Sequence, residues 1–333
     1  MAELALCEPV ELYNLLNQTR TVPRLAEINY LCLIGEISAA VAWCLMVLFS
    51  CSRCFIETSV MKNFSVSFLD AQETHHFLTG HIITARHVKT AGDGTFYLPD
   101  AVKLDTMQNV VIYDSTTSSL EEENGRAIDC ARELGKSCYR PIQILAGGYR
   151  LFSAIYPFLR TEKTLYTIWE LESLRLYPLE VIPGLLYMGD LKQSQGSLWN
   201  LKIRAIVSIS QFTQSDFSKA EKETRVILDI PLADKVESDL YSNFETTCSF
   251  ISSHIDEGSR VLIVSREGTS RCSAVVLAFL IHYFRYTLEE SWSYIIKCKP
   301  TMRPNTGFLQ QLCEWEVLTI GKTDTDLSKP PFL

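Results

Sequence analysis

The sequence lacks the excess of positive charge that is typical of proteins that bind nucleic acid or anionic membranes. Its 31 Lys and Arg residues stand against 39 Asp and Glu residues, which gives a net charge of −8. This balance argues against a general binder of nucleic acid or of anionic membranes. Any anion-binding site in this chain must therefore be local.

The cysteines are scattered and do not form a metal-binding pattern. There are 11 of them, and the one close pair, Cys51 and Cys54, has no second pair to complete a zinc site. There is no secretory signal, and the acidic start, Met1–Glu8, is unlike a transit peptide. We therefore expect free thiols in a reducing, cytoplasmic compartment, with no metal and no other cofactor. Four loosely clustered histidines are expected to be structural or surface residues: His75, His76, His81 and His87.

Short apolar runs alternate with amphipathic stretches along the 333 residues. Strands that alternate with helices predict a parallel α/β sheet, and the length allows two such domains. In the first half, the predicted strands are Tyr30–Ile34, Val110–Tyr113 and Pro141–Leu145, and the predicted helices are Glu8–Leu16 and Asn124–Gly135. In the second half, the predicted strands are Leu185–Met188, Ala205–Ile209, Val226–Ile230 and Arg260–Val264, and the predicted helices are Phe244–Ile255, Thr269–Tyr283, Leu288–Cys298 and Thr306–Leu318.

The turn residues and composition also suggest domain boundaries. We expect a first domain at 1–161, a helical linker at 162–175 and a second domain at 176–320. The polar residues 321–333 are expected to be a disordered tail.

A strand, a glycine-containing loop and a helix follow one another near residue 265. The loop N–H groups and the positive end of the helix dipole converge in such an arrangement, which makes a cradle for an anion. Arg271 adds a planar guanidinium suited to phosphate oxygens. The alternative is a polar loop that only caps a helix. The predicted phosphate-binding residues are Ser265, Arg266, Glu267, Gly268, Thr269, Ser270 and Arg271.

The stretch Val264–Arg271 resembles the His-Cys-x-x-Gly-x-x-Arg signature of cysteine-based protein phosphatases. Gly268 and Arg271 match this signature. The histidine position is Val264 and the nucleophile position is Ser265. The resemblance therefore covers the anion-binding part of the signature and departs from its catalytic part.

The wider sequence around this loop resembles the dual-specificity phosphatases. Tyr177–Gly189 is similar to their opening strand segment, and Arg303–Phe308 to their closing segment. Ile230–Asp234 is similar to their general-acid loop, because Asp234 lies 265 − 234 = 31 residues before Ser265. The resemblance implies an α/β phosphatase fold for nearly all of the second domain.

A serine at the nucleophile position changes what this signature can do. The helix dipole and the arginine of such a cradle lower the pKa of a cysteine enough to form a thiolate. A serine hydroxyl starts far higher and needs an adjacent base, and Val264 replaces the nearest candidate. The resemblance therefore implies a catalytically inactive pseudophosphatase with degenerate positions at Ser265 and Val264.

Three alternatives stay open at the sequence level. Asp234 is either a relic of the general acid or a solvated turn aspartate. Cys272, one residue past the arginine, is expected to be a small core thiol, the alternative being a substitute nucleophile. The third alternative is a weak enzyme with unknown chemistry.

The first domain resembles the rhodanese domains. Gly80–Ala85 is similar to their Gly-His-Ile-x-x-Ala turn and Leu145–Tyr149 to their Leu-x-Gly-Gly turn. The strand Val110–Tyr113 leads to the position of their catalytic cysteine, which is Asp114 here. A carboxylate cannot carry a persulfide and repels anions, so we expect a non-catalytic rhodanese-like domain.

A rhodanese-like domain followed by a dual-specificity phosphatase domain is the architecture of the MAP-kinase phosphatases. That family docks its kinase through an arginine cluster, whereas Arg86–Lys89 has only two full positive charges, which puts docking of a MAP kinase in doubt. The loss of both cysteines resembles the STYX-like pseudophosphatases of this family. This resemblance implies signalling roles in stress-granule control and mitochondrial apoptosis, and with them a mitochondrial association.

Residues Gly35–Leu69 interrupt the rhodanese-like pattern. Within them, Ile37–Ser52 carries no charge, but its sixteen residues reach only about 24 Å as a helix. A membrane span needs roughly 20 residues, so we do not expect membrane insertion. An isoform or gene-model segment that lowers the stability of the first domain is the favoured interpretation.

Two functional hypotheses follow. The leading one is a regulator or scaffold that binds phosphorylated proteins, or other signalling proteins, without cleaving phosphate. An active phosphatase and a stress-granule assembly protein are candidate partners. The alternative is a phosphate-independent scaffold that uses the rhodanese-like domain.

Overall fold

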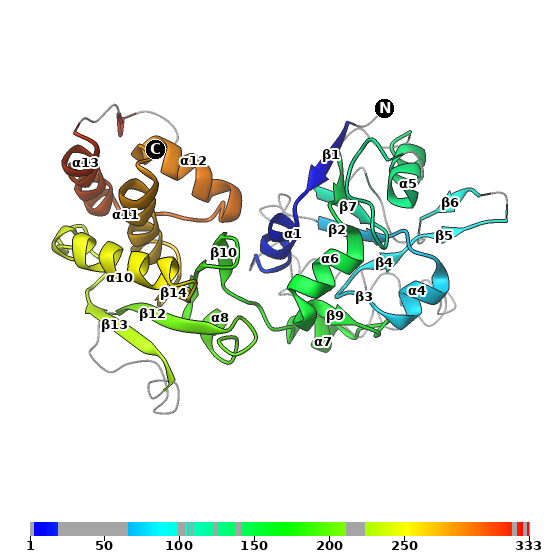
Figure 1. The fold of residues 1–333 in the computed structure, drawn as a ribbon, viewed down its shortest axis with the longest axis horizontal. Coiled ribbons are helices and arrows are strands. Elements are labelled where there is room, and N and C mark those ends of the chain that lie inside the picture. Colours follow the sequence, from blue (N-terminus) through cyan, green and yellow to red (C-terminus); the bar gives the residue numbers. More distant parts are fainter. Residues whose placement is uncertain are drawn as a thin grey trace, which may run out of the picture. The chain divides into compact units, whose positions relative to one another are not determined.

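The computed structural model describes residues 3–18, 66–92, 94–98, 104, 107, 109–122, 125–136, 141–210, 224–321, 325–328 and 332. The chain divides into two compact units, Met1–Leu174 and Arg175–Leu333 (Figure 1). Each unit contains one five-stranded sheet with helices beside it. The predicted strand Tyr30–Ile34 and the apolar run Ile37–Ser52 lie outside the described residues.

The sheet of the second unit has the strand order β10-β11-β14-β12-β13. Only the pair of β10 and β11 is antiparallel among these strands; the other neighbours are parallel. Both Asp190, at the end of β11, and Ile209, near the end of β12, pair with Ser265. Ser265 therefore lies at the carboxyl edge of the sheet, where parallel α/β sheets form their ligand sites. The strands are β10 (Leu179–Ile182), β11 (Leu186–Asp190), β12 (Ile203–Ser210), β13 (Val226–Pro231) and β14 (Arg260–Ser265).

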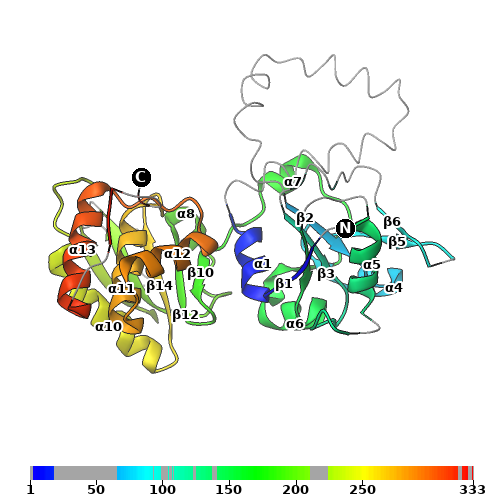
Figure 2. The same cartoon turned by 90° about the horizontal axis from the view of Figure 1, so that it is seen from above.

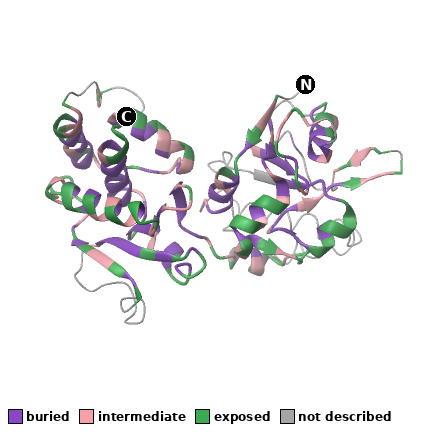
Figure 3. Ribbon diagram, in the orientation of Figure 1, coloured by how far each residue is buried: buried purple, intermediate pink, exposed green. Residues whose placement is uncertain are grey.

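Helix α11 (Arg271–Phe284) is the central helix of this unit. Its residues are buried without a break from Arg271 to Ile281, and Figure 3 shows this helix in the colour of buried residues. A helix that is apolar all round lies inside a domain. It packs against β14 and the three helices α10 (Phe244–Asp256), α12 (Leu288–Cys298) and α13 (Thr306–Ile320). This packing fixes the start of α11, and with it the loop that precedes it. The short elements of the unit are α8 (Leu191–Ser194) and the 3₁₀ turn η3 (Tyr241–Asn243).

The sheet of the first unit has the order β1-β8-β7-β2-β4, and each of these neighbouring pairs is parallel. Figure 2 shows α1, α5 and α6 around its strands. The strands of the sheet are β1 (Leu4–Cys7), β2 (Val66–Asp70), β4 (Arg86–His87), β7 (Asn109–Tyr113) and β8 (Ile142–Leu145). The helices are α1 (Pro9–Leu16), α4 (Thr74–Thr79), α5 (Arg126–Leu134), α6 (Gly148–Ile155), the 3₁₀ turn η2 (Pro157–Leu159) and α7 (Ile168–Glu172). Two small ribbons add β3 (His81–Ile82) with β9 (Arg160–Thr161), and β5 (Lys89–Thr90) with β6 (Phe96–Tyr97).

Strand β2 corrects one boundary drawn from the sequence. The predicted insertion ended at Leu69, but Val66–Leu69 form most of β2, which pairs with β7 along its whole length. Phe68 and Leu69 are buried in this sheet. The end of the interrupting segment therefore lies before Val66, and its residues 35–65 lie outside the described part of the chain.

Most described elements match the sequence patterns. Helix α12 has the predicted bounds, and α11 begins two residues later than predicted, at Arg271 instead of Thr269. In the predicted tail, Thr325 Oγ1 donates to Glu316 Oε1 at 3.2 Å, and the ring of Phe332 lies 5.0 Å from that of Trp292. The domain limits and the disorder of the tail as a whole stay predictions. None of the described helices combines the length and the apolar character of a membrane span.

Candidate functional site

The loop between β14 and α11 approaches the carboxyl end of β11 closely. Gly268 has a φ of +64°, and a Cβ atom added there would lie 2.7 Å from Asp190 N and 2.8 Å from Gly189 C. Only glycine adopts this conformation readily and leaves room for the neighbouring backbone. Ser265 is 3% exposed at the start of this loop. The glycine of the predicted signature is thus required by the geometry of the loop.

Arg271 is a buried cation at the first position of α11. Its side chain is 5% exposed, and its Nη1 donates to the backbone oxygen of Leu232 at 2.9 Å. Its Nε, by contrast, has no hydrogen-bond partner among the described residues. Buried donors are nearly always satisfied, and a guanidinium pairs well with phosphate oxygens. An oxyanion is the kind of ligand that would complete the hydrogen bonding of Arg271.

Asp234 lies against this arginine and is held by two neutral donors. Its Oδ2 is 3.6 Å from Arg271 Nε. Its Oδ1 accepts from Ser270 Oγ at 2.7 Å and from Asn305 Nδ2 at 2.9 Å. The structure therefore places Asp234 in a network that joins three segments, and its side chain is only 33% exposed.

The other predicted residues of the loop have different surroundings. Arg266 and Glu267 are 73% and 76% exposed, and they pair with each other at 3.8 Å. The Thr269 backbone oxygen accepts from Arg303 N at 2.9 Å. The geometry therefore brings Gly268, Ser270 and Arg271 into one place and leaves Arg266 and Glu267 at the surface.

Val264 and Cys272 are both fully buried beside Ser265. Burial raises the pKa of the Cys272 thiol, although nearby Lys299 and a hydrogen bond with the Ser265 side chain act in the opposite direction. A buried thiol with a raised pKa stays protonated and is a poor nucleophile. The Ser265 side chain is hydrogen-bonded with the Cys272 thiol, and the residue before it is the apolar Val264. We therefore expect Cys272 to be a protonated core thiol and not a substitute nucleophile.

Asp114 fills the corresponding loop of the first unit with its own carboxylate. This residue follows β7 and is 6% exposed. It accepts from Thr116 N at 3.0 Å, from Thr117 N at 2.8 Å and Oγ1 at 2.6 Å, and from Ala127 N, in the first turn of α5, at 2.9 Å. Burial raises the pKa of Asp114, but the hydrogen bonds from Thr117, Ala127 and Thr116 outweigh it and lower that pKa below the ordinary value.

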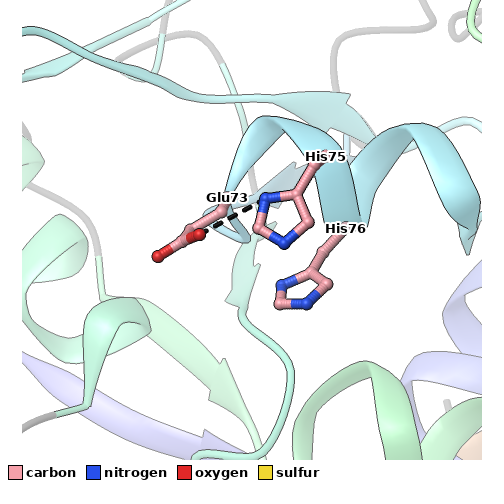
Figure 4. A group of neighbouring side chains, drawn as sticks. All are labelled: Glu73, His75 and His76. Carbon is pink, nitrogen blue, oxygen red and sulfur yellow. Dashed lines mark ion pairs between the residues drawn. The ribbon is translucent and has the colours of Figure 1, made fainter.

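The histidines predicted as structural or surface residues fall into two groups. His81 Nδ1 lies 2.9 Å from Phe77 O, and its Nε2 lies 3.1 Å from Lys163 O, so both ring nitrogens are engaged by the backbone. Glu73, His75 and His76 form an exposed group on and before α4, with ligand atoms within 4.8 Å of one another (Figure 4). Glu73 is already paired with His75 at 3.3 Å. Within the described residues this is the one such group of possible ligand atoms, and exposed groups of this kind are common without a bound ion.

Residues 186–317 match the family model described as "Dual specificity phosphatase, catalytic domain". The second half of the chain carries a dual-specificity phosphatase-like domain. Strand β14, the loop Ser265–Ser270 and helix α11 all lie inside the matched residues. The family match also includes Asp234 and Asn305, which the hydrogen bonds bring together.

Curated relatives with related names are similar over less than half of this chain. A probable rhodanese domain-containing dual specificity protein phosphatase of Dictyostelium discoideum is 31% identical over 43% of this chain and 29% of that protein. The dual specificity protein phosphatase 5 of Rattus norvegicus is 30% identical over 46% and 39%, respectively. The serine/threonine/tyrosine-interacting protein of Homo sapiens is 27% identical over 45% and 70%. The chain thus spans well under half the length of the first two.

A solved structure is similar to the same part of the chain. It is the crystal structure of the human tyrosine phosphatase-like serine/threonine/tyrosine-interacting protein. It is 27% identical, has a TM-score of 0.39, and covers 42% of this chain and 95% of that one.

Proposed function

We propose that this protein is a pseudophosphatase, which binds phosphorylated Ser, Thr or Tyr side chains at Ser265–Arg271 without cleaving them. The observation that carries the proposal is the buried guanidinium of Arg271, whose Nε has no hydrogen-bond partner in the described structure. Such a group gains a charge-assisted hydrogen bond when an oxyanion enters. The similarity to tyrosine phosphatase-like interacting proteins supports a role as a regulator or scaffold in signalling.

The chemistry at Ser265 supports binding without turnover. Covalent phosphoryl transfer needs a nucleophile that is ionised or activated by a base. Ser265 contacts the protonated thiol of Cys272, and the preceding residue is the apolar Val264. A serine in these surroundings does not form an alkoxide near neutral pH, so the bound phosphate stays on its protein.

We propose that the first unit is a non-catalytic rhodanese-like module. Asp114 occupies its loop, so this unit is expected to contribute protein contacts instead of anion binding. Phosphorylated signalling proteins, an active phosphatase and a stress-granule assembly protein remain the proposed partners. The mitochondrial association and the apoptotic role rest only on the STYX-like resemblance.

The proposal is tested with a phosphorylated peptide and its unphosphorylated form, titrated into the full chain. We expect measurable preference for the phosphorylated form, loss of that preference in Arg271→Ala, and no phosphate release during the measurement. Arg204→Ala is the matched control, because it removes the same charge from an exposed site of the same unit, outside Ser265–Arg271. Equal affinity for the two peptides would refute the proposal.

A phosphate-independent scaffold is the second candidate function. The observation that favours it is Asp234, because its carboxylate already lies 3.6 Å from the cation that a phosphate would use. If this candidate is correct, Arg271→Ala still captures the same partners as the unchanged protein in a pull-down. If the first candidate is correct, the phosphate-dependent partners are lost.

A further inference from the structure

The loop that carries Asp234, residues 232–240 between β13 and η3, is hydrogen-bonded to helix α13. Gln311, on that helix, accepts at its Oε1 from Leu240 N and from Tyr241 N, both at 2.8 Å. Its Nε2 donates to Ser238 O, also at 2.8 Å. One side chain thus satisfies three backbone groups of the loop and fixes its later half to the helix.

The middle of the same loop rests directly on the first turn of α13. A Cβ atom added at Gly307 would overlap the backbone oxygen of Val236. Because nothing larger than hydrogen fits there, the position of the loop depends on glycine at this helix position. Gly307 is therefore a contact that a single methyl group can break without changing any charge.

The beginning of the loop completes the attachment. Asn305, the N-cap of α13, accepts from Phe308 N at 3.0 Å and donates to Asp234 at 2.9 Å. The Leu232 backbone oxygen accepts from Arg271. Helix α13 therefore holds the carboxylate of Asp234 against the buried guanidinium of Arg271.

We propose that Asp234 is an internal competitor of the phosphate ligand, and that α13 sets its strength by holding the loop in this position. The inference rests on the proposed function and concerns its regulation. Asp234 and a phosphate are both anions, and both use Arg271, so they repel each other at close range. A phosphoprotein therefore binds more weakly than the cradle alone would allow, and any partner that lifts the loop from α13 strengthens the binding.

Asp234→Asn is the primary test. It keeps an acceptor oxygen for Ser270 and Asn305 and removes the charge beside Arg271. We expect the full chain to bind the phosphorylated peptide about tenfold more tightly, which corresponds to one charge–charge interaction of modest strength. Asp239→Asn is the matched control, because Asp239 lies in the same loop but bonds with Ser242 instead. Its affinity should equal that of the unchanged protein.

Two further variants test the role of α13 without altering charge. Asn305→Ser keeps a good N-cap residue and removes the donor to Asp234, and Gly307→Ala displaces the loop at Val236. Both should raise the affinity about threefold, less than Asp234→Asn because the carboxylate is loosened but still present. Faster hydrogen exchange at the amides of Leu240 and Tyr241 in Gly307→Ala should accompany the gain.

The outcomes separate this inference from the proposed function. In one set of outcomes, the unchanged protein binds the phosphopeptide while Asp234→Asn gains no affinity, or while Asp239→Asn gains as much. Either result overturns the role of Asp234 as a competitor and leaves the proposed binding function intact. Binding by neither the unchanged protein nor Asp234→Asn overturns both. Should Gly307→Ala fail to fold, Asn305→Ser and Asp234→Asn still decide the matter.

Discussion

The loops that follow β7 and β14 occupy similar places in their two units. They differ in where the carboxylate beside each loop comes from. Each loop follows a parallel strand and leads towards a helix, α5 in one unit and α11 in the other. In the first loop, Asp114 belongs to the loop itself and is bonded to its amides. In the second loop, the carboxylate that lies against Arg271 is that of Asp234, which comes from another segment.

From this difference we propose that the Asp114 loop is closed to anions permanently and that the Ser265 loop is closed reversibly. A carboxylate within the loop leaves only when the loop unfolds, because its hydrogen bonds are part of the loop's structure. A carboxylate on a separate loop leaves when that loop moves. We infer that the first unit has lost anion binding altogether, whereas the second keeps it in a weakened form.

Removal of the Asp114 carboxylate should have the largest effect on stability. Asp114→Ala leaves three backbone N–H groups, two of them in buried hydrogen bonds, and one buried hydroxyl without their acceptor. The cost of unsatisfied buried donors predicts a loss of about 3 kcal/mol in the first unit. Thermal or denaturant unfolding measures it, and Asp114→Asn, which keeps one acceptor oxygen, should lose less. An unchanged melting temperature for Asp114→Ala would contradict the assigned role.

Substitution of Gly268, in the loop that follows β14, should have the second largest effect on stability. Gly268→Ala places a methyl group against the backbone of Gly189 and Asp190 at a φ of +64°, so we expect about 2 kcal/mol of destabilisation together with loss of phosphopeptide binding. Gly258→Ala is the matched control: its φ is +73°, but no atom lies within 4 Å of the added Cβ. If the two variants behave alike, conformational strain alone explains the effect, and the close approach does not matter.

The smallest predicted effect is a pH dependence of the first unit. Because hydrogen bonds lower the pKa of Asp114 in the folded state, its contribution to stability is complete above the ordinary value of 3.8. That contribution disappears as the pH falls through the lower folded-state pKa. The difference in stability between the unchanged protein and Asp114→Asn should therefore shrink below pH 3.8. A difference that stays constant between pH 6 and pH 2 would argue against an ionised Asp114.

The sequence predicted the local structure well, because local patterns determine it. The run Arg260–Val264, followed by a glycine loop and an apolar helix, gave the strand, loop and helix that the structure contains. The strand at Val66–Asp70 was missed because the spacing of a family resemblance placed it in an insertion. Its alternation of Val66 and Phe68 with polar residues was the available signal.

The sequence could not give the contacts between distant segments. Asn305 and Asp234 are 71 residues apart, and Ser270 and Asp234 are 36 apart, so no periodicity connects them. Asp114 was predicted to repel anions, but its hydrogen bonds with the loop were not foreseen. The spacing of Asp114 and Thr117 was the available signal, because an aspartate often bonds with backbone N–H groups two or three residues ahead.

One measurement tests the contrast between the two loops most directly. Inorganic phosphate is titrated into the isotope-labelled full chain, and the backbone amide signals of both loops are followed by NMR in the same sample. We predict saturable shifts at Gly268, Ser270 and Arg271, larger in Asp234→Asn, and no shift at Thr116, Thr117 or Ala127. Shifts at the Asp114 loop, or none at the Ser265 loop in either protein, would contradict the account.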